Sequence, residues 1–167
     1  MNELKTQDKP KIGLGGGCHW CTEAVFQELK GVFAVSQGWI CSNEANQNPS
    51  EAITLYFDPE VISLEILMKI HLMTHASTSD HSMRGKYRSA VYFTSEAQKQ
   101  EILNILSKLQ LEFDQPLITQ CLPLIDFKLN EESFLNYYQK QPDAPFCQTY
   151  ISPKLALLRK EFRANVL

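Results

Sequence analysis

The stretch "KIGLGGGCHWCTEAVFQELKGV", residues Lys11 to Val32, holds the strongest structural signal in this chain. Ile12 and Leu14 predict the end of a short strand, which runs into three consecutive glycines. Thr22 to Lys30 carries apolar residues at helical spacing, and Gly31 is a natural place for a helix to stop. The stretch therefore predicts a strand, a tight glycine turn and a helix.

This order places Cys18 at or near the N-terminus of the predicted helix. Unpaired backbone N–H groups and the helix dipole stabilise a thiolate there, and the thiolate is the nucleophilic form of cysteine. Consecutive glycines also let the backbone bend close to a bound group. The position favours a reactive cysteine, with a small buried cysteine on a glycine turn as the alternative.

The composition is that of an ordinary globular protein, with 44% hydrophobic and 21% charged residues in a chain of 167. We expect one catalytic domain over residues 1–167, with a flexible lead-in at 1–10 and a C-terminal loop and helix at 141–167. A net charge of -3 gives no basic field for nucleic acid, and no apolar run is long enough for a membrane. The polar N-terminus lacks the apolar core of a secretory signal. Together with an odd number of cysteines, five, this predicts a reducing, cytoplasmic location and no disulfide framework. We expect a monomer.

The rest of the chain alternates apolar strands and amphipathic helices. The "SAVYF" segment is one expected strand, and Ser63 and Ser95 are expected to cap two of the helices. The strands are expected at 32–41, 51–57, 89–93 and 117–124, and the helices at 64–72, 96–111, 131–139 and 154–164. The pair 32–41 and 51–57 indicates an antiparallel hairpin. This order predicts an α/β (α+β) two-layer sandwich with a ferredoxin-like split βαβ core and a mixed sheet.

Cys18 and Cys21 form a C-x-x-C pair that is open to three interpretations. A thioredoxin-like redox pair needs a proline-entered apolar strand facing it, and Pro59, in an acidic turn, fits that role poorly. A zinc site needs a second ligand pair, but Cys121 and Cys147 stand alone, and the histidines at 71, 75 and 81 show no clean spacing. We therefore predict no metal site. The third interpretation, a single nucleophile at Cys18, comes from the rest of the chain.

The sequence resembles the A-type peptide methionine sulfoxide reductases, the methionine-S-sulfoxide reductases. "GCHWCTEAVFQELKGV" is similar to the family's G-C-F-W-x-x-E segment and L-x-G-V turn, and "VSQGWICS" to its G-Y-x-G segment. "NPSEAITLYFDPEVISLEILMKI" resembles H-A-E-x-V-x-x-x-Y-D-P-x-x-I-S-Y-E-x-L-L, and "HAST…GKYRSAVYFTSEAQK" resembles H-D-P-T…G-T-Q-Y-R-S-A-I-Y. The pieces occur in order from about Ile12 to the C-terminus.

The resemblance implies a thiol-dependent reduction of methionine S-sulfoxide, free or in peptides, to methionine. It implies that Cys18 attacks the sulfoxide sulfur while a carboxylic acid, Glu51, protonates the oxygen. Tyr87 would hydrogen-bond the same oxygen. Trp20 and Trp39 would form apolar walls around the substrate S-methyl group.

The same resemblance implies that the product leaves Cys18 as a sulfenic acid, which a second thiol converts to a disulfide. Cys147, in a proline-containing loop near the C-terminus, matches the family's resolving cysteine, and Cys21 is its rival. We favour Cys147, because a loop can move to reach Cys18. Thioredoxin would then reduce the disulfide, and no bound cofactor is implied.

Several residues depart from the family pattern. His19 replaces a phenylalanine beside the nucleophile, where it could pair with the thiolate or the substrate oxygen, or point to solvent. Trp39 replaces a tyrosine, and Asp80, or Ser82, is the nearest match for the family's aspartate. Ser50 replaces a histidine, and Phe134-Leu135 replaces an H-Q pair. The alternative functions are a divergent relative that acts on or binds another sulfur compound, and a disulfide oxidoreductase that uses Cys18 and Cys21.

Overall fold

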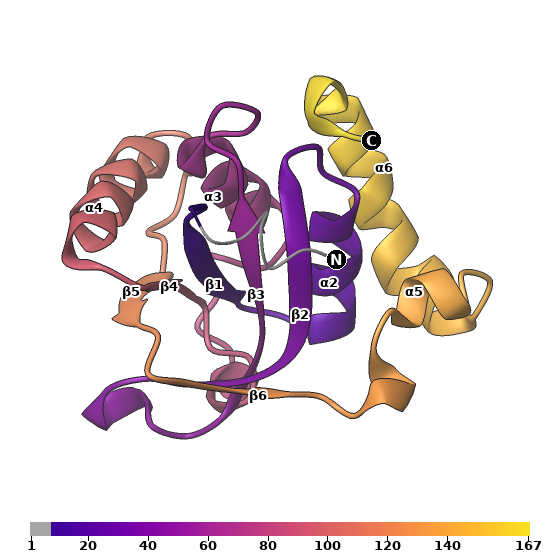
Figure 1. Ribbon diagram of the computed structural model, residues 1–167, viewed down its shortest axis with the longest axis horizontal. Coiled ribbons are helices and arrows are strands. Elements are labelled where there is room, and N and C mark those ends of the chain that lie inside the picture. The colour runs from indigo at the N-terminus through magenta and orange to yellow at the C-terminus, as the bar shows by residue number, and fades with distance from the viewer. Residues whose placement is uncertain (1–7) are drawn as a thin grey trace.

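The strands of the computed structural model, which describes residues 8–167, form one mixed sheet (Figure 1). Across the sheet the order is β5-β4-β1-β3-β2-β6, and only β4 and β5 pair in parallel. The strands are β1 (Lys11–Gly15), β2 (Val32–Cys41), β3 (Ser50–Phe57), β4 (Ala90–Phe93), β5 (Gln120–Pro123) and β6 (Asp126–Leu129). The central order β4-β1-β3-β2 is that of a split βαβ sandwich, so the predicted fold class is confirmed.

Helices cover one face of this sheet. Figure 1 shows α2 and α6 beside β2 at the right of the view and α4 at the left. The helices are α2 (His19–Gln27), α3 (Leu64–Met73), α4 (Glu96–Gln110), the short α5 (Tyr137–Lys140) and α6 (Ser152–Glu161). Within residues 8–167, no helix has the length and apolarity needed to cross a membrane.

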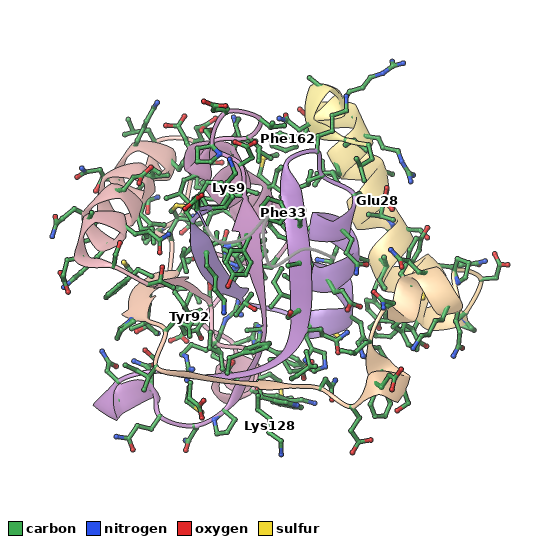
Figure 2. All side chains as sticks on the ribbon, in the orientation of Figure 1. Lys9, Glu28, Phe33, Tyr92, Lys128 and Phe162 are labelled. Atoms are coloured by element: carbon green, nitrogen blue, oxygen red, sulfur yellow. The ribbon has the colours of Figure 1, made fainter. Side chains whose placement is uncertain are left out.

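The main core lies between the sheet and these helices. On β1, Leu14 is opposite Ile53 of β3 on one side and Val91 of β4 on the other, and all three are fully buried. Tyr92 belongs to a smaller buried cluster with Ile40, Ala52, Ala90 and Leu122. It lies in the lower half of Figure 2, whereas Phe162 of the main core lies near the top. Successive side chains along a strand point to opposite faces of the sheet, so the two clusters lie on opposite faces.

Most predicted elements lie where the sequence places them. β2 has its predicted bounds. Ser63 and Ser95 cap α3 and α4, because each side-chain oxygen accepts a hydrogen bond from the backbone N–H three residues on, at Ile66 and Gln98. Helix α2 begins at His19, three residues before the predicted start, because the Cys18 carbonyl already accepts from the N–H groups that follow it.

The predicted helix at 131–139 is wrong. A 3-10 turn (Glu132–Phe134) and the short α5 replace it. Between them Leu135 is extended and Asn136 is left-handed, with φ 56°. Asparagine tolerates this conformation, and the Asn136 N–H donates to Glu23 Oε2 at 3.1 Å, which compensates the interrupted helix. Strand β6, which comes just before this segment, was not predicted.

The predicted domain ends in a lead-in at 1–10 and a C-terminal loop and helix at 141–167, and the helix is present as α6. Residues 1–7 of the predicted lead-in lie outside the described residues, while Lys9 pairs with Asp58 at 3.5 Å and the Pro10 carbonyl accepts from the Phe57 N–H. The prediction that Cys147 lies in a loop is wrong. Cys147 begins a π-helical turn (Cys147–Ile151) that leads into α6, and its side chain is fully buried in the main core.

Candidate active site

The glycine turn sets where Cys18 lies. Gly16 has φ +152°, and a Cβ there would come within 2.4 Å of the His75 ring, so only glycine fits both the backbone and the packing. β1 ends at Gly15, and Cys18 is the N-cap residue of α2. The predicted placement of Cys18 at a helix N-terminus therefore matches the structure.

Three donors surround the Cys18 sulfur and lower the pKa of its thiol. The strongest cause is a hydrogen bond from the Cys21 thiol, one helical turn away, and the backbone N–H groups of Trp20 and Cys21 add to it. Burial and the nearby Glu51 charge oppose this effect. The same hydrogen bond raises the pKa of Cys21, because ionising Cys21 would remove the donor. Cys18 is thus the more acidic thiol of the pair, and Cys21 is its proton-bearing partner.

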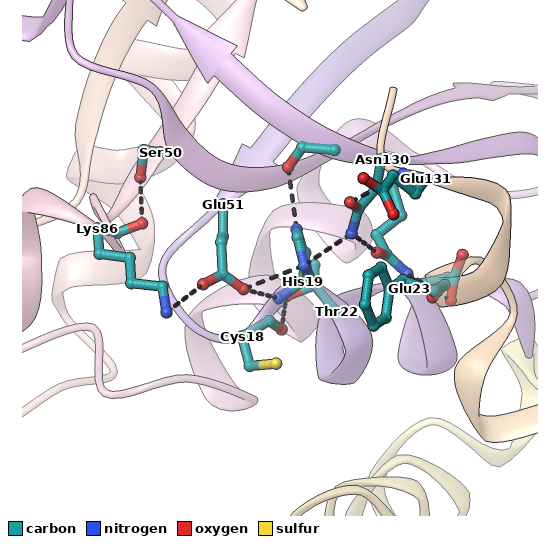
Figure 3. Close-up of polar contacts among 12 residues, drawn as sticks. Cys18, His19, Thr22, Glu23, Ser50, Glu51, Lys86, Asn130 and Glu131 are labelled. Carbon is teal, nitrogen blue, oxygen red and sulfur yellow. Dashed lines mark hydrogen bonds and ion pairs between the residues drawn. The ribbon is translucent and has the colours of Figure 1, made fainter. Parts of the chain in front are cut away.

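Glu51 faces the same helix N-terminus from β3. It shares the face of β3 with the buried Ile53, and its own side chain is 5% exposed. Oε1 accepts from the His19 backbone N–H at 3.2 Å and lies 3.3 Å from His19 Nε2. Oε2 lies 3.3 Å from Lys86 Nζ (Figure 3). A nearly buried carboxyl group therefore lies between a ring nitrogen and a lysine.

His19 is held on both ring nitrogens. Nδ1 lies 3.0 Å from the Gly38 carbonyl, and Asn130 Nδ2 lies 3.2 Å from Nε2 (Figure 3). A side chain at Gly38 would collide with the Lys128 carbonyl, so the close approach of β6 requires glycine there. Burial lowers the pKa of His19, and the Gly38 hydrogen bond and the Glu51 charge oppose that shift.

A second set of buried hydrogen bonds supports this side of the site. Asn130 Nδ2 also donates to Gln37 Oε1 at 2.8 Å, and Gln37 Nε2 donates to Glu23 Oε1 at 2.9 Å. Glu23 lies 2% exposed on α2, and burial raises its pKa. These contacts fasten α2 to β2 and to the segment after β6.

Aromatic rings form the other wall. Trp20 stacks on Tyr137 with ring centroids 4.0 Å apart and planes 7° apart, and it also meets Phe134 and Phe146. Trp39 contacts the His19 ring edge-to-face at 5.3 Å. Such surfaces favour a thioether and its methyl group.

These groups enclose one cavity of about 320 Å³. Tyr87 lies at its rim, where the Lys86 ammonium is 5.2 Å from the ring centroid. Burial, followed by the Glu51 charge, raises the pKa of Tyr87, so its hydroxyl remains a donor. The lining residues are Cys18, His19, Trp20, Trp39, Glu51, Lys86, Tyr87, Asn130, Phe134 and Phe146. The cavity can hold a small polar group between a thiolate and a carboxyl group.

A larger recess of about 480 Å³ adjoins this cavity and shares Cys18, Tyr87 and Phe146 with it. Cys21, His71, His75 and Lys154 are among its lining residues. Lys154 donates to the Thr74 carbonyl at the end of α3, and burial lowers the pKa of Lys154. No group of three or more metal-ligating His, Cys, Asp or Glu side chains occurs in the part of the chain that the structure describes.

The structure brings together six of the residues singled out from the sequence, namely Cys18, His19, Trp20, Trp39, Glu51 and Tyr87. Cys21 lies on the recess side of Cys18. Asp80 is not brought to either space; it lines a separate cavity with Arg84 and Arg88. Cys147 lines neither space, although it packs in the core close enough to Cys21 to raise the pKa of Cys21.

Sequence reasoning missed Lys86 and Asn130. Lys86 directly precedes Tyr87 in "GKYRS" and could have been found as a neighbour of a candidate residue. Asn130 follows β6, a four-residue strand with a single partly buried apolar position, so no local signal identified it. The aromatic wall from Phe134, Tyr137 and Phe146 depends on the broken helix, which was predicted as continuous.

Comparisons with known proteins identify the family of this chain. The family described as "Peptide methionine sulfoxide reductase" matches residues 10–166. The peptide methionine sulfoxide reductase MsrA of Psychrobacter sp. (strain PRwf-1) is 34% identical, over 91% of this chain and 95% of that protein. MsrA of Deinococcus radiodurans is also 34% identical, over 88% and 79%.

Solved structures show the same fold. Reduced Mxr1 from Saccharomyces cerevisiae superposes with a TM-score of 0.73 at 21% identity, covering 90% of this chain and 94% of that one. Methionine sulfoxide reductase A of Corynebacterium diphtheriae superposes with a TM-score of 0.67 at 23% identity, covering 80% and 76%. The sequence matches, over nearly the whole chain, settle the family: this chain belongs to the peptide methionine sulfoxide reductases.

Proposed function

We propose that this protein reduces methionine S-sulfoxide, free or in peptides, to methionine, with Cys18 as the nucleophile. One observation carries the proposal: a cysteine whose pKa is lowered and a buried carboxyl group line the same aromatic-walled cavity. A nucleophile and an acid on two sides of one small space suit the cleavage of a polar S–O bond.

In the proposed reaction the Cys18 thiolate attacks the sulfoxide sulfur while Glu51 gives a proton to the oxygen. The oxygen then passes to the Cys18 sulfur. Thiolate, sulfoxide and one proton become a sulfenic acid and the thioether, so the substrate is reduced by two electrons and Cys18 is oxidised by two. Tyr87 donates a hydrogen bond to the same oxygen, and Trp20 and Trp39 contact the S-methyl group.

The resolving thiol remains a choice between Cys21 and Cys147, and the geometry favours Cys21. The Cys21 thiol already donates to the Cys18 sulfur, whereas Cys147 is fully buried in a helical turn and must first be released. Attack of Cys21 on the sulfenic acid forms the Cys18–Cys21 disulfide and releases water. Cys147, next to Cys21 in the core, is then placed to exchange into that disulfide.

A dithiol protein of the thioredoxin class is the proposed reductant. The yeast relative Mxr1 forms a complex with Trx2. A cytoplasmic location is also proposed, since the cysteines are all free thiols. A monomeric state is proposed because residues of one chain complete the site.

The test is a coupled assay with thioredoxin, thioredoxin reductase and NADPH, supplied with free or peptide methionine S-sulfoxide. Wild type should consume NADPH with either substrate, and Cys18→Ser should not. Methionine R-sulfoxide is the matched control substrate and should be left unchanged. Absence of turnover with both forms of the S-sulfoxide would refute the proposal.

A disulfide oxidoreductase that uses Cys18 and Cys21 is the second candidate, because the two thiols are hydrogen-bonded. Its signature is reduction of an unrelated protein disulfide, such as insulin, at a rate that Glu51→Gln leaves unchanged. Sulfoxide reduction that depends on Glu51 argues for the first candidate instead.

A further inference from the structure

His19 and Glu51 approach each other closely enough to share a proton. Nδ1 faces the Gly38 carbonyl at 3.0 Å, and a carbonyl can only accept, so Nδ1 carries a hydrogen. In the neutral ring Nε2 is then a bare acceptor. Glu51 Oε1 lies 3.3 Å from it. Two unprotonated acceptors at that distance repel, so a proton between them is favoured.

The orientation of Asn130 supports the Nδ1–H tautomer of His19, because Asn130 presents an N–H donor to Nε2. Its Oδ1 accepts from the Glu131 backbone N–H at 2.9 Å, which turns Nδ2 toward both His19 Nε2 and Gln37 Oε1. Nε2 therefore receives one neutral donor from Asn130 and still faces the carboxyl group. The amide provides a hydrogen bond but cannot supply the missing proton to the pair.

The charged and titratable groups around His19 come from every side of it. Glu51 lies on β3, Lys86 and Tyr87 precede β4, and Cys18 precedes His19 on its own helix. Lys86 Nζ and the His19 backbone N–H both contact the Glu51 carboxyl group, at 3.3 Å and 3.2 Å. A general acid must regain its proton after each turnover, and His19 Nε2 is the ring nitrogen beside Glu51 Oε1.

We propose that His19 is a positioning and proton-storing residue: it shares one proton with Glu51 in the reduced protein and reloads Glu51 after each oxygen transfer. This inference rests on the proposed sulfoxide reduction. When Glu51 gives its proton to the sulfoxide oxygen, the proton stays on the sulfenic acid and Glu51 is left as a carboxylate. His19 takes a proton from solvent at Nε2 and passes it to Oε1, which restores the acid.

The first test is the pH dependence of oxygen transfer in a single turnover, measured as methionine formed per Cys18 before any disulfide exchange. His19→Phe keeps an aromatic ring against Trp39 and removes the proton. The rate should then begin to fall at a pH about one unit lower than in wild type. This gives about a tenfold loss at pH 8 and little loss at pH 5.5, where solvent protons are more abundant. A uniform loss at all pH values would indicate a structural role and overturn the proposal.

His81→Asn is the matched control. His81 is exposed, outside the cavity, and caps a 3-10 turn through Nδ1, a contact that asparagine can also make. Its pH profile should coincide with that of wild type. A shifted profile in His81→Asn equal to that in His19→Phe would overturn the assignment to His19.

The second test needs neither substrate nor turnover. In protein labelled with ¹⁵N-histidine, NMR reports protonation at each ring nitrogen of His19. The Nδ1 signal should be that of an N–H, and the Nε2 signal should be intermediate and should move in Glu51→Gln. An Nε2 signal that is unaffected by Glu51→Gln between pH 5 and 9 would overturn the shared proton. This readout stands even if the coupled assay refutes sulfoxide reduction, so the two failures can be told apart.

Discussion

The Cys21 thiol donates a hydrogen bond to the Cys18 sulfur one helical turn back, and this contact is the largest cause that lowers the pKa of Cys18. The pair is therefore asymmetric before any oxidation occurs. One sulfur is prepared for attack, and the other holds the proton. The asymmetry separates a nucleophile from its helper without requiring a metal or a distant base.

Cys21→Ala should raise the pKa of Cys18, because a methyl group cannot donate. At pH 7 alkylation of Cys18 by iodoacetamide should slow by about tenfold for each unit of that rise. The measurement is the rate of Cys18 labelling against pH, followed by mass spectrometry of the Cys18 peptide. Cys21→Ser keeps a donor and should shift the profile less. Equal shifts in the two variants would mean that the hydrogen bond does not lower the pKa.

Glu51→Gln should slow oxygen transfer by about 10²- to 10⁴-fold, the usual contribution of a general acid. Alkylation of Cys18 should not slow, since the Glu51 charge raises the pKa of Cys18 and its removal favours the thiolate. Both rates are measured on the same preparation at pH 7. A variant that loses both reactivities together would point to a damaged site rather than a missing acid.

Lys154→Met should slow disulfide formation more than oxygen transfer. The Lys154 ammonium lowers the pKa of Cys21, which must lose its proton to attack the sulfenic acid. Without that charge, the rate of disulfide formation should rise only at higher pH than in wild type, while methionine formation in the first turnover changes little. Lys108→Met, at an exposed site on α4, is the control and should leave both rates unaltered. If Lys154→Met leaves the pH profile of disulfide formation in place, the charge has no part in this step.

The sequence predicted correctly the positions of those residues that lie in elements with a strong local pattern. Cys18 and Glu51 belong to elements with strong periodicity, a glycine turn followed by a helix and a buried strand, so their positions could be predicted before their contact was known. The substitution at His19 was visible in the sequence, but its contacts with Gly38 and Asn130 depend on β6, which is short and mostly exposed.

The remaining errors came from tertiary contacts that override local preference. Asn136 interrupts a helical pattern because its N–H is satisfied by Glu23, more than a hundred residues earlier in the chain. Cys147 was expected in a loop because of the prolines and polar residues before it, yet the apolar side chains around it fold into a helical turn on the core. Neither contact can be predicted from the residues adjacent in the sequence.

His71 should make the free energy of unfolding of this protein fall as the pH is lowered. Its Nε2–H donates to the Gly15 carbonyl at 2.8 Å, and its buried Nδ1 has no hydrogen-bond partner among the described residues. Protonating Nδ1 would bury a charge without an acceptor, and burial accordingly lowers the pKa of His71 to about 4. The unfolded chain, with a pKa near 6.5, binds that proton more readily, so the stabilisation is complete above about pH 6.5 and is lost as the pH falls toward 4.

His71→Gln keeps a donor toward Gly15 and removes the titration. Between pH 7 and pH 5 the free energy of unfolding in urea should fall by about 2 kcal/mol less in this variant than in wild type. His81→Gln, at an exposed histidine, should leave the wild-type difference intact. An equal loss of stability in wild type and His71→Gln would place the acid sensitivity elsewhere, with the neighbouring His75, whose pKa burial also lowers, as the next residue to replace.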